Sequence, residues 1–350
     1  MRPRALALHA GHEARTRVLA EGLHPGLFDV VVGASGGAKW LVLSALDRLL
    51  FPWLLRDRLR PLACVGSSIG AWRHLCLALP DPAAATARLC DAYIGQDYED
   101  GAGTADVSRV SRGILQTVLG ASGAAQVVEH ATVHTHVLAV RARGPWRSGS
   151  GAGLIAATAG TAFSNLLSRR ALGPWMERHC FHTGPRERAP GFGTFPTRHV
   201  ALSAQTLPSA LMASGSIPLV AEGVRDLLPG EVFWDGGMMD YHILPEFGER
   251  QGLVLYPHFY AHLAPGWFDK PLRWRHRRPV EWSRLLMLSP TPELVASLPD
   301  GRLADWRDMR RFPTAERQQR WRAVASAAER LAEDFVALCE GRGLGEALGG

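Results

Sequence analysis

Short apolar runs that end in glycine-rich turns recur along this chain, and the first two are each followed by apolar residues at helical spacing. Residues 28–32 (FDVVV) lead into Gly-Ala-Ser-Gly-Gly, and residues 38–50 carry apolar side chains three and four positions apart. Residues 61–65 (PLACV) lead into Gly-Ser-Ser-Ile-Gly, and residues 71–79 continue as a helix. A strand, a tight turn and a helix, twice in succession, predict parallel α/β architecture.

The later pattern extends this architecture toward the end of the chain. Residues 209–218 predict a helix that ends before Pro218, and residues 313–338 predict a long helix with charged residues on one side. Further apolar runs predict paired strands at 126–141 and single strands at 231–234, 252–256 and 285–288. Because no linker-like segment interrupts the chain, we expect one α/β domain over residues 1–350.

The composition excludes several classes of protein. Hydrophobic residues make up 47% of the chain and charged residues 21%, which suits a large core and excludes a disordered or fibrous protein. No apolar stretch approaches the roughly 20 residues of a membrane-spanning helix. The apolar run near the N-terminus is too short for a signal peptide, so we expect a cytoplasmic protein. The five cysteines lack zinc-like spacing and are expected to be buried thiols.

The positive charge of the chain is modest and almost entirely arginine. A net charge of +6 permits attraction to anionic surfaces without requiring nucleic acid, and we predict no nucleic-acid partner. Lys39 and Lys270 are the only lysines among 39 basic residues. We interpret this bias first as codon usage and only second as function.

Two segments match the G-x-S-x-G pattern of a nucleophile elbow, in which a sharp strand-to-helix turn presents a serine hydroxyl. They are Gly66-Ser67-Ser68-Ile69-Gly70 and Gly33-Ala34-Ser35-Gly36-Gly37. Small residues flank the serine because the turn has no room for side chains. The pattern alone is weakly specific in a glycine-rich chain, and the strand before and helix after each match give it weight.

The two segments need different roles if both are functional. Gly36-Gly37-Ala38-Lys39 suits an anion cradle, since a glycine run at a helix start leaves several backbone N–H groups free. It would form the oxyanion hole, with Lys39 adding charge or a structural tie, and Ser68 would be the nucleophile. Residues 33–40 also approach the phosphate-loop pattern, but Ala38 and Trp40 replace required residues, which argues against ATP or GTP.

A carboxylate is available further along the chain. Asp235 follows the predicted strand 231–234 and precedes Gly236 and Gly237. An aspartate at a strand end, with glycines beside it, can reach into a cleft and act as the base for a serine hydroxyl. The alternative is an ordinary Asp-Gly turn between strands.

These three motifs, in this order, resemble those of the patatin-like phospholipase family. In that family a G-G-x-[RK] oxyanion loop is followed by a G-x-S-x-G elbow and later by a catalytic aspartate in D-G-[GA]. The matching residues here are Gly36-Gly37-Ala38-Lys39, then Ser68 between Gly66 and Gly70, then Asp235.

The resemblance covers about residues 28–245, and the segment 213–218 looks like the one that precedes the aspartate strand in such proteins. It implies a three-layer α/β/α sandwich with a mostly parallel central sheet. It also implies a Ser68–Asp235 dyad that cleaves acyl esters of lipids with neither a metal nor another cofactor. Lys39 stands where arginine is usual in the family.

Two other functions remain open. In an α/β-hydrolase-type esterase the order along the chain is serine, acid, histidine, and Ser35, Asp235 and then His242, His258 or His262 satisfy it. A non-catalytic lipid-binding protein of patatin-like fold would keep the cleft without turning over a substrate.

Two segments outside the motifs also suggest roles. Residues 266–286 mix tryptophans with arginines, a combination that suits contact with an anionic membrane surface. The alternative is a solvated basic loop whose tryptophans pack into the core. Residues 177–197 contain several Gly, Pro, Arg and His residues and are a candidate flap over the site.

Overall fold

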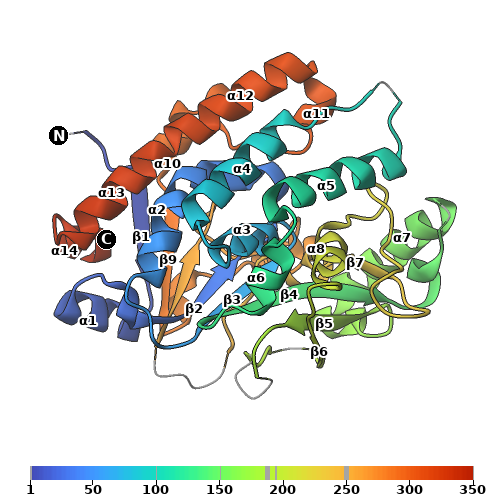
Figure 1. Ribbon diagram of the computed structural model, residues 1–350, viewed down its shortest axis with the longest axis horizontal. Helices are drawn as coiled ribbons and strands as arrows, with labels where there is room; N and C mark the ends of the chain where they lie inside the picture. The colour runs from blue at the N-terminus through green and yellow to red at the C-terminus, as the bar shows by residue number, and fades with distance from the viewer. Residues whose placement is uncertain are drawn as a thin grey trace.

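Helices flank a mostly parallel central sheet in a three-layer α/β/α arrangement, which confirms the expected fold class (Figure 1). The computed structural model describes residues 2–99, 101–149, 151–185, 190–193, 195–247 and 252–349. The strands are β1 (Leu6–Ala10), β2 (Phe28–Gly33), β3 (Leu62–Ser67), β4 (Val133–Ala142), β5 (Met176–His182), β6 (Thr197–Ala201), β7 (Phe233–Asp235), β8 (Leu253–Pro257) and β9 (Leu285–Pro290).

The helices connect these strands and cover the sheet. In chain order they are α1 (His12–Glu21), α2 (Ser44–Leu55), α3 (Ile69–Leu77), α4 (Pro82–Gly95), α5 (Thr104–Leu119), α6 (Gly123–Val128), α7 (Gly151–Leu167), α8 (Leu207–Gly215), α9 (Gly237–Asp240), α10 (Pro292–Ser297), α11 (Asp308–Arg311), α12 (Thr314–Ala327), α13 (Glu329–Cys339) and α14 (Leu344–Gly349). In the described part of the chain, no helix has the length and apolar composition needed to cross a bilayer.

The nine described strands form one sheet in the order β1-β9-β8-β2-β3-β4-β5-β6, with β7 also paired to β4. The pairings β9–β8, β8–β2, β2–β3 and β3–β4 are parallel, whereas β1–β9, β4–β5 and β4–β7 are antiparallel. Strands β2, β3, β8 and β9 are the apolar runs predicted from the sequence. The strand order reverses between β2 and β8, where open α/β sheets bind ligands at the carboxyl ends of their strands.

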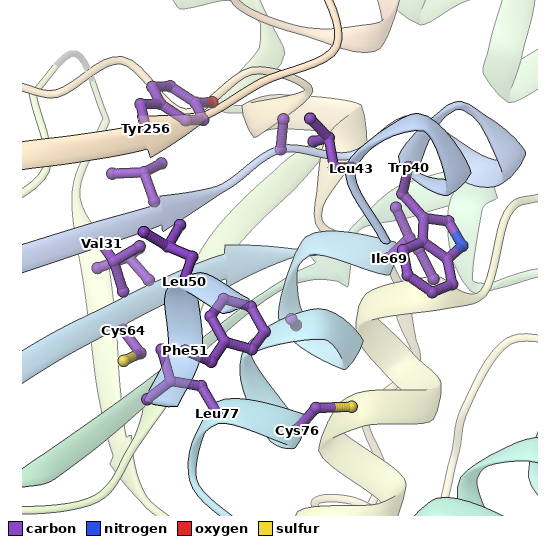
Figure 2. Packing of buried hydrophobic residues seen from close by; sticks show 14 of the residues in the cluster. Val31, Trp40, Leu43, Leu50, Phe51, Cys64, Ile69, Cys76, Leu77 and Tyr256 are labelled. Carbon is purple, nitrogen blue, oxygen red and sulfur yellow. The ribbon is translucent and has the colours of Figure 1, made fainter. Parts of the chain in front are cut away.

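The core beneath this point joins the sheet to α2 and α3. Figure 2 shows Val31 of β2 and Cys64 of β3 packed with Phe51 of α2 and Leu77 of α3. A buried ion pair adds a polar link between the two helices, because Arg73 donates to both carboxylate oxygens of Asp47, at 2.6 and 2.7 Å. These contacts fix α3, the helix that follows Ser68.

Several predicted elements differ from those observed. The predicted helix 38–50 begins as a 3₁₀ helix, η2 (Gly37–Leu43), before α2. The predicted strand pair 126–141 is wrong, since this segment contains the end of α6 and the single strand β4. Short apolar runs such as those in α6 suit a helical turn as well as a strand. Strand β4 pairs with β3, β5 and β7, which are distant in sequence, and not with a neighbouring strand in a local hairpin.

The C-terminal helix is also interrupted. The predicted helix 313–338 consists of α12 and α13, which follow each other closely along the molecule in Figure 1. Between them, Leu331 N–H donates to Ala328 O at 3.0 Å, a bond that spans three residues and tightens the helical ladder there. The predicted flap 177–197 begins inside β5 and reaches the start of β6, and its residues 186–189 and 194 lie outside the described residues.

Candidate active site

The carboxyl ends of β3 and β7 meet end to end along one edge of β4. Strand β3 pairs with β4 as far as Ser67 opposite Leu138, and β7 pairs with β4 from Asp235 opposite Ala139. Strand β5 occupies the other edge of β4 along the same stretch. The residue after β3, Ser68, therefore meets the last residue of β7 across 167 positions of the chain.

Ser68 lies in a sharp turn between β3 and α3 that has the geometry of a nucleophile elbow. Its backbone φ is 54° and its ψ is −131°, a strained combination for a residue with a Cβ. A Cβ at Gly66 would lie 2.5 Å from the backbone N and Cα of Ala71. A Cβ at Gly70 would lie 2.0 Å from the carbonyl oxygen of Gly33. The turn therefore requires glycine at both flanking positions.

Asp235 is the hydrogen-bond partner of the Ser68 hydroxyl. Ser68 Oγ donates to Asp235 Oδ2 at 2.6 Å, and Gly237 N–H donates to Oδ1 at 2.6 Å. Only 7% of Ser68 and 5% of Asp235 is exposed. Burial raises the pKa of Asp235 from 3.8 to about 6, although both hydrogen bonds and the charge of Lys270 act in the opposite direction. The carboxylate therefore titrates close to neutral pH.

The C-terminal end of α8 holds the serine turn and the aspartate strand together. Ser214 Oγ accepts from Ser68 N–H at 2.8 Å and donates to Leu138 O at 2.6 Å. Ser216 O accepts from Asp235 N–H at 2.9 Å. Both serines belong to the segment 213–218, which therefore contacts both members of the dyad directly.

The glycine loop after β2 lies against the elbow, because Gly33 and Gly70 touch through their backbones. Gly37 adopts a φ of 56°, which glycine tolerates at little cost. Within the described residues, the N–H groups of Gly36, Gly37 and Ala38 donate no hydrogen bond. Free N–H groups beside a serine turn are what an oxyanion site requires.

Lys39 has a structural partner. Its Nζ donates to Asp305 Oδ2, and the two side chains are only 12% and 19% exposed. Of the two roles considered for Lys39, this geometry supports the structural tie, since the ammonium group is already paired. The ion pair anchors the start of η2 to the segment that follows α10.

Ser35 lies beside the dyad and bonds to a serine rather than to a histidine. Its Oγ donates to Ser67 Oγ at 3.0 Å. His242 and His258 are fully buried, and burial lowers the pKa of His242 well below 6.5 and that of His258 to about 3. In the part of the chain that the structure describes, neither of them nor His262 forms a hydrogen bond with Ser35. The alternative triad is therefore not assembled around Ser35.

Lys270 belongs to this site, and sequence reasoning missed it. Its Nζ lies 4.5 Å from the centre of the Tyr241 ring, and its side chain reaches solvent. Loss of hydration among the surrounding protein atoms and repulsion from Lys39 lower the pKa of Lys270 to about 8, against the attraction of Asp305 and Asp235. The available signal was the scarcity of lysine, since the structure brings the only two lysines of the chain into electrostatic contact.

The assembled groups are a serine hydroxyl, a buried carboxylate and free backbone N–H groups, a set that suits acyl transfer. Across the described ranges, no group of three or more His, Cys, Asp or Glu side chains is arranged to hold a metal ion.

Comparison with known proteins found no family model and no curated protein that matches this chain. The resemblance to patatin-like phospholipases therefore rests on the residues themselves, namely the loop at 36–39, the elbow around Ser68, and Asp235.

Replacement of Gly70 by Ala is expected to destabilise the protein by about 3 kcal/mol or more, because the new Cβ would overlap the backbone of Gly33. Gly113→Ala in α5 is the matched control, since nothing lies within 4 Å of a Cβ at that position and alanine favours a helix. Urea unfolding of both variants measures the difference. A Gly70→Ala protein as stable as the parent would contradict the close contact between the two turns.

The stability of Asp235→Asn relative to wild type is expected to increase as the pH rises. A carboxyl whose pKa is raised by folding stabilises the folded state below its unfolded pKa and loses that contribution as the pH rises through the folded value. With a pKa that rises from 3.8 to about 6, the advantage of Asp235→Asn over wild type should grow by about 2 kcal/mol between pH 4 and pH 8. Urea unfolding at both pH values measures this growth. An advantage that does not change with pH would show that the carboxyl keeps its ordinary pKa.

Proposed function

We propose that this protein is a serine acyl hydrolase that cleaves carboxylic esters of lipids through Ser68 and Asp235. The hydrogen bond of 2.6 Å from Ser68 Oγ to Asp235 Oδ2 carries the proposal. It joins a serine on a strained, glycine-flanked turn to a carboxylate whose raised pKa allows it to accept and return a proton near neutral pH.

In the first half of the reaction, Asp235 accepts the hydroxyl proton while Ser68 Oγ attacks the ester carbonyl. The carbonyl oxygen becomes an oxyanion, and the free N–H groups of Gly36, Gly37 and Ala38 donate to it. The intermediate then collapses, the bond to the leaving alcohol breaks, and Asp235 gives its proton to that alcohol. An acyl group remains on Ser68.

In the second half, Asp235 accepts a proton from a water molecule that attacks the acyl carbonyl. The second oxyanion uses the same N–H groups, and the bond from the acyl carbon to Ser68 Oγ breaks as the proton returns to Ser68. Carboxylic acid leaves and the dyad is restored. Neither half requires a cofactor, since Asp235 carries every proton.

The lipid class of the substrate rests on the resemblance of the three motifs to patatin-like phospholipases. The expectation that the enzyme acts in the cytoplasm remains a prediction from the sequence. Contact of residues 266–286 with an anionic membrane surface also remains a proposal. Among the large aromatic residues of this segment, Trp274 is exposed at 71%, whereas Trp267, Phe268 and Trp282 are partly buried.

A fluorophosphonate probe should label Ser68, because an activated serine hydroxyl attacks the phosphorus, fluoride leaves, and the phosphoryl oxygen of the phosphonylated serine occupies the oxyanion site. Labelling should disappear in Ser68→Ala, persist in Ser35→Ala, and slow by about a hundredfold or more in Asp235→Asn. Mass spectrometry of the labelled peptide locates the adduct. Hydrolysis of a short-chain phospholipid by the same variants should follow the same order.

Each other outcome supports a different function or mechanism. Label on Ser35 that survives in Ser68→Ala would identify Ser35 as the nucleophile and would require a base other than Asp235. A folded wild-type protein with neither label nor turnover would favour the non-catalytic lipid-binding function. Full turnover by Asp235→Asn would remove the carboxylate from the mechanism.

The labelling rate should rise with pH and level off above an apparent pKa of about 6, since only the ionised Asp235 accepts the serine proton. Rates measured between pH 4.5 and pH 8.5 give the profile. In Asp235→Asn the rise through pH 6 should vanish. His262→Asn is the control, and its profile should match wild type. A rise that Asp235→Asn retains would assign the titrating base to another group.

A further inference from the structure

Helix α7 exposes four large apolar side chains to solvent, although Leu154 and Ala157 of the same helix pack into the core. The large side chains on its outer face are Ile155, Phe163, Leu166 and Leu167, which are 60%, 65%, 50% and 71% exposed. The exposed positions between them are mostly alanines, and the helix contains no charged residue. Such a face is the reverse of an ordinary surface helix, which turns its apolar stripe toward the core.

The inward face of α7 combines Leu154 and Ala157 with polar side chains that have specific partners. Thr161 Oγ1 accepts from the indole N–H of Trp146 at 2.8 Å. Ser164 Oγ accepts from the indole N–H of Trp175 at 3.0 Å. Asn165 Nδ2 donates to the buried carboxylate of Asp269 at 2.8 Å. These bonds fix the rotation of the helix, so the apolar face cannot turn inward without breaking all three.

The surroundings of this face carry positive charge. From residue 144 to residue 176 the sequence contains no Asp or Glu, while Arg147, Arg169 and Arg170 lie within that stretch. Arg169 pairs with Asp269 and Arg147 lies 4.0 Å from Glu231, whereas Arg170 has no ion pair among the described residues. Arg275, in the 3₁₀ helix η7 (Arg273–Arg275), donates to the carbonyl oxygens of Asn165 and Leu166 at the C-terminal end of α7. This contact holds the exposed Arg273 and Trp274 beside the apolar face.

We propose that the apolar face of α7 docks into the interfacial region of an anionic lipid bilayer. At 17 residues the helix is about 25 Å long and would lie in the plane of the surface, with Ile155, Phe163, Leu166 and Leu167 among the acyl chains. Arg170 and Arg273 would meet anionic headgroups, and Trp274 would lie at headgroup level. Figure 1 shows α7 at one margin of the molecule, with α13 and α14 toward the opposite margin.

Charge and chemistry favour lipid over a protein partner. An interface between proteins offers hydrogen-bonding groups around its apolar centre. The outer face of α7 offers almost none, because Thr161, Ser164 and Asn165 bond to residues outside the helix and Thr158 bonds to the carbonyl oxygen of Leu154 within it. An apolar stripe with arginines and a tryptophan at its end matches an anionic membrane interface. This inference rests on α7 and the basic residues beside it, and it does not depend on the proposed catalysis.

Co-sedimentation with large unilamellar vesicles tests the proposal, using pure phosphatidylcholine and a mixture with 30 mol% phosphatidylglycerol. The Ser68→Ala variant is used throughout, so that hydrolysis cannot alter the vesicles. We expect binding to the anionic vesicles that falls at least tenfold in Phe163→Gln/Leu167→Gln. The matched control is Leu19→Gln/Leu59→Gln, which removes exposed apolar side chains elsewhere and should bind as the parent does. Arg170→Gln/Arg273→Gln should bind less tightly than the parent to the anionic vesicles, with no change in its binding to pure phosphatidylcholine vesicles.

Two results would overturn the proposal. One is a parent protein that does not sediment with anionic vesicles at low salt. The other is equal vesicle binding by the parent and Phe163→Gln/Leu167→Gln. A dimer by light scattering that dissociates in this variant, without vesicle binding, would assign the face to a second copy of the chain. Circular dichroism verifies that each variant is folded, and Ile155→Gln/Leu166→Gln replaces any that is not. Vesicle binding without fluorophosphonate labelling of wild type would reject the catalytic proposal and leave this one intact.

Discussion

The backbone contact between Gly33 and Gly70 is the constraint around which the candidate site is arranged. Adjacent strands β2 and β3 lie one hydrogen-bonded spacing apart, so the turns that follow them compete for the same space. A Cβ at Gly70 would lie 2.0 Å from Gly33 O, and a Cβ at Gly33 would lie 2.6 Å from Gly70 O. Because both are glycine, the loop with the free N–H groups can lie directly beside the turn that carries Ser68.

The site also concentrates groups that cost stability, and the rest of the fold offsets that cost. Asp235 is charged at neutral pH although it is almost fully buried, and Ser68 has an unfavourable φ. The helix that follows Ser68 is held by the apolar packing of Figure 2 and by the bidentate contact between Arg73 and Asp47. Without this packing below the turn, the backbone at Ser68 would relax to a less strained conformation. The stability of the core therefore maintains the geometry of the site.

The parts of the fold that the sequence predicts are the local ones. Strands β2 and β3 and the turn at Ser68 depend on residues within about ten positions of one another, and the glycine spacing specifies them. The end-to-end meeting of β3 and β7 depends on a register with β4, which no local pattern reveals. Lys270 is distant in sequence from the dyad, and only its rarity marked it. Helix α7 escaped notice because Thr161 and Asn165 face inward, against the usual rule of amphipathic helices.

A single buried carboxylate connects the outer helix to the neighbourhood of the dyad. Asp269 accepts from Asn165 of α7 and from Arg169, and the next residue, Lys270, stacks on the ring of Tyr241. Tyr241 in turn accepts from the backbone of the glycine loop. Asp269 also accepts from Arg275, so its carboxylate has three partners, and these bonds hold the C-terminal end of α7 against the segment that carries Lys270. The orientation of the serine relative to a surface that holds α7 is therefore fixed by the fold rather than by a flexible tether.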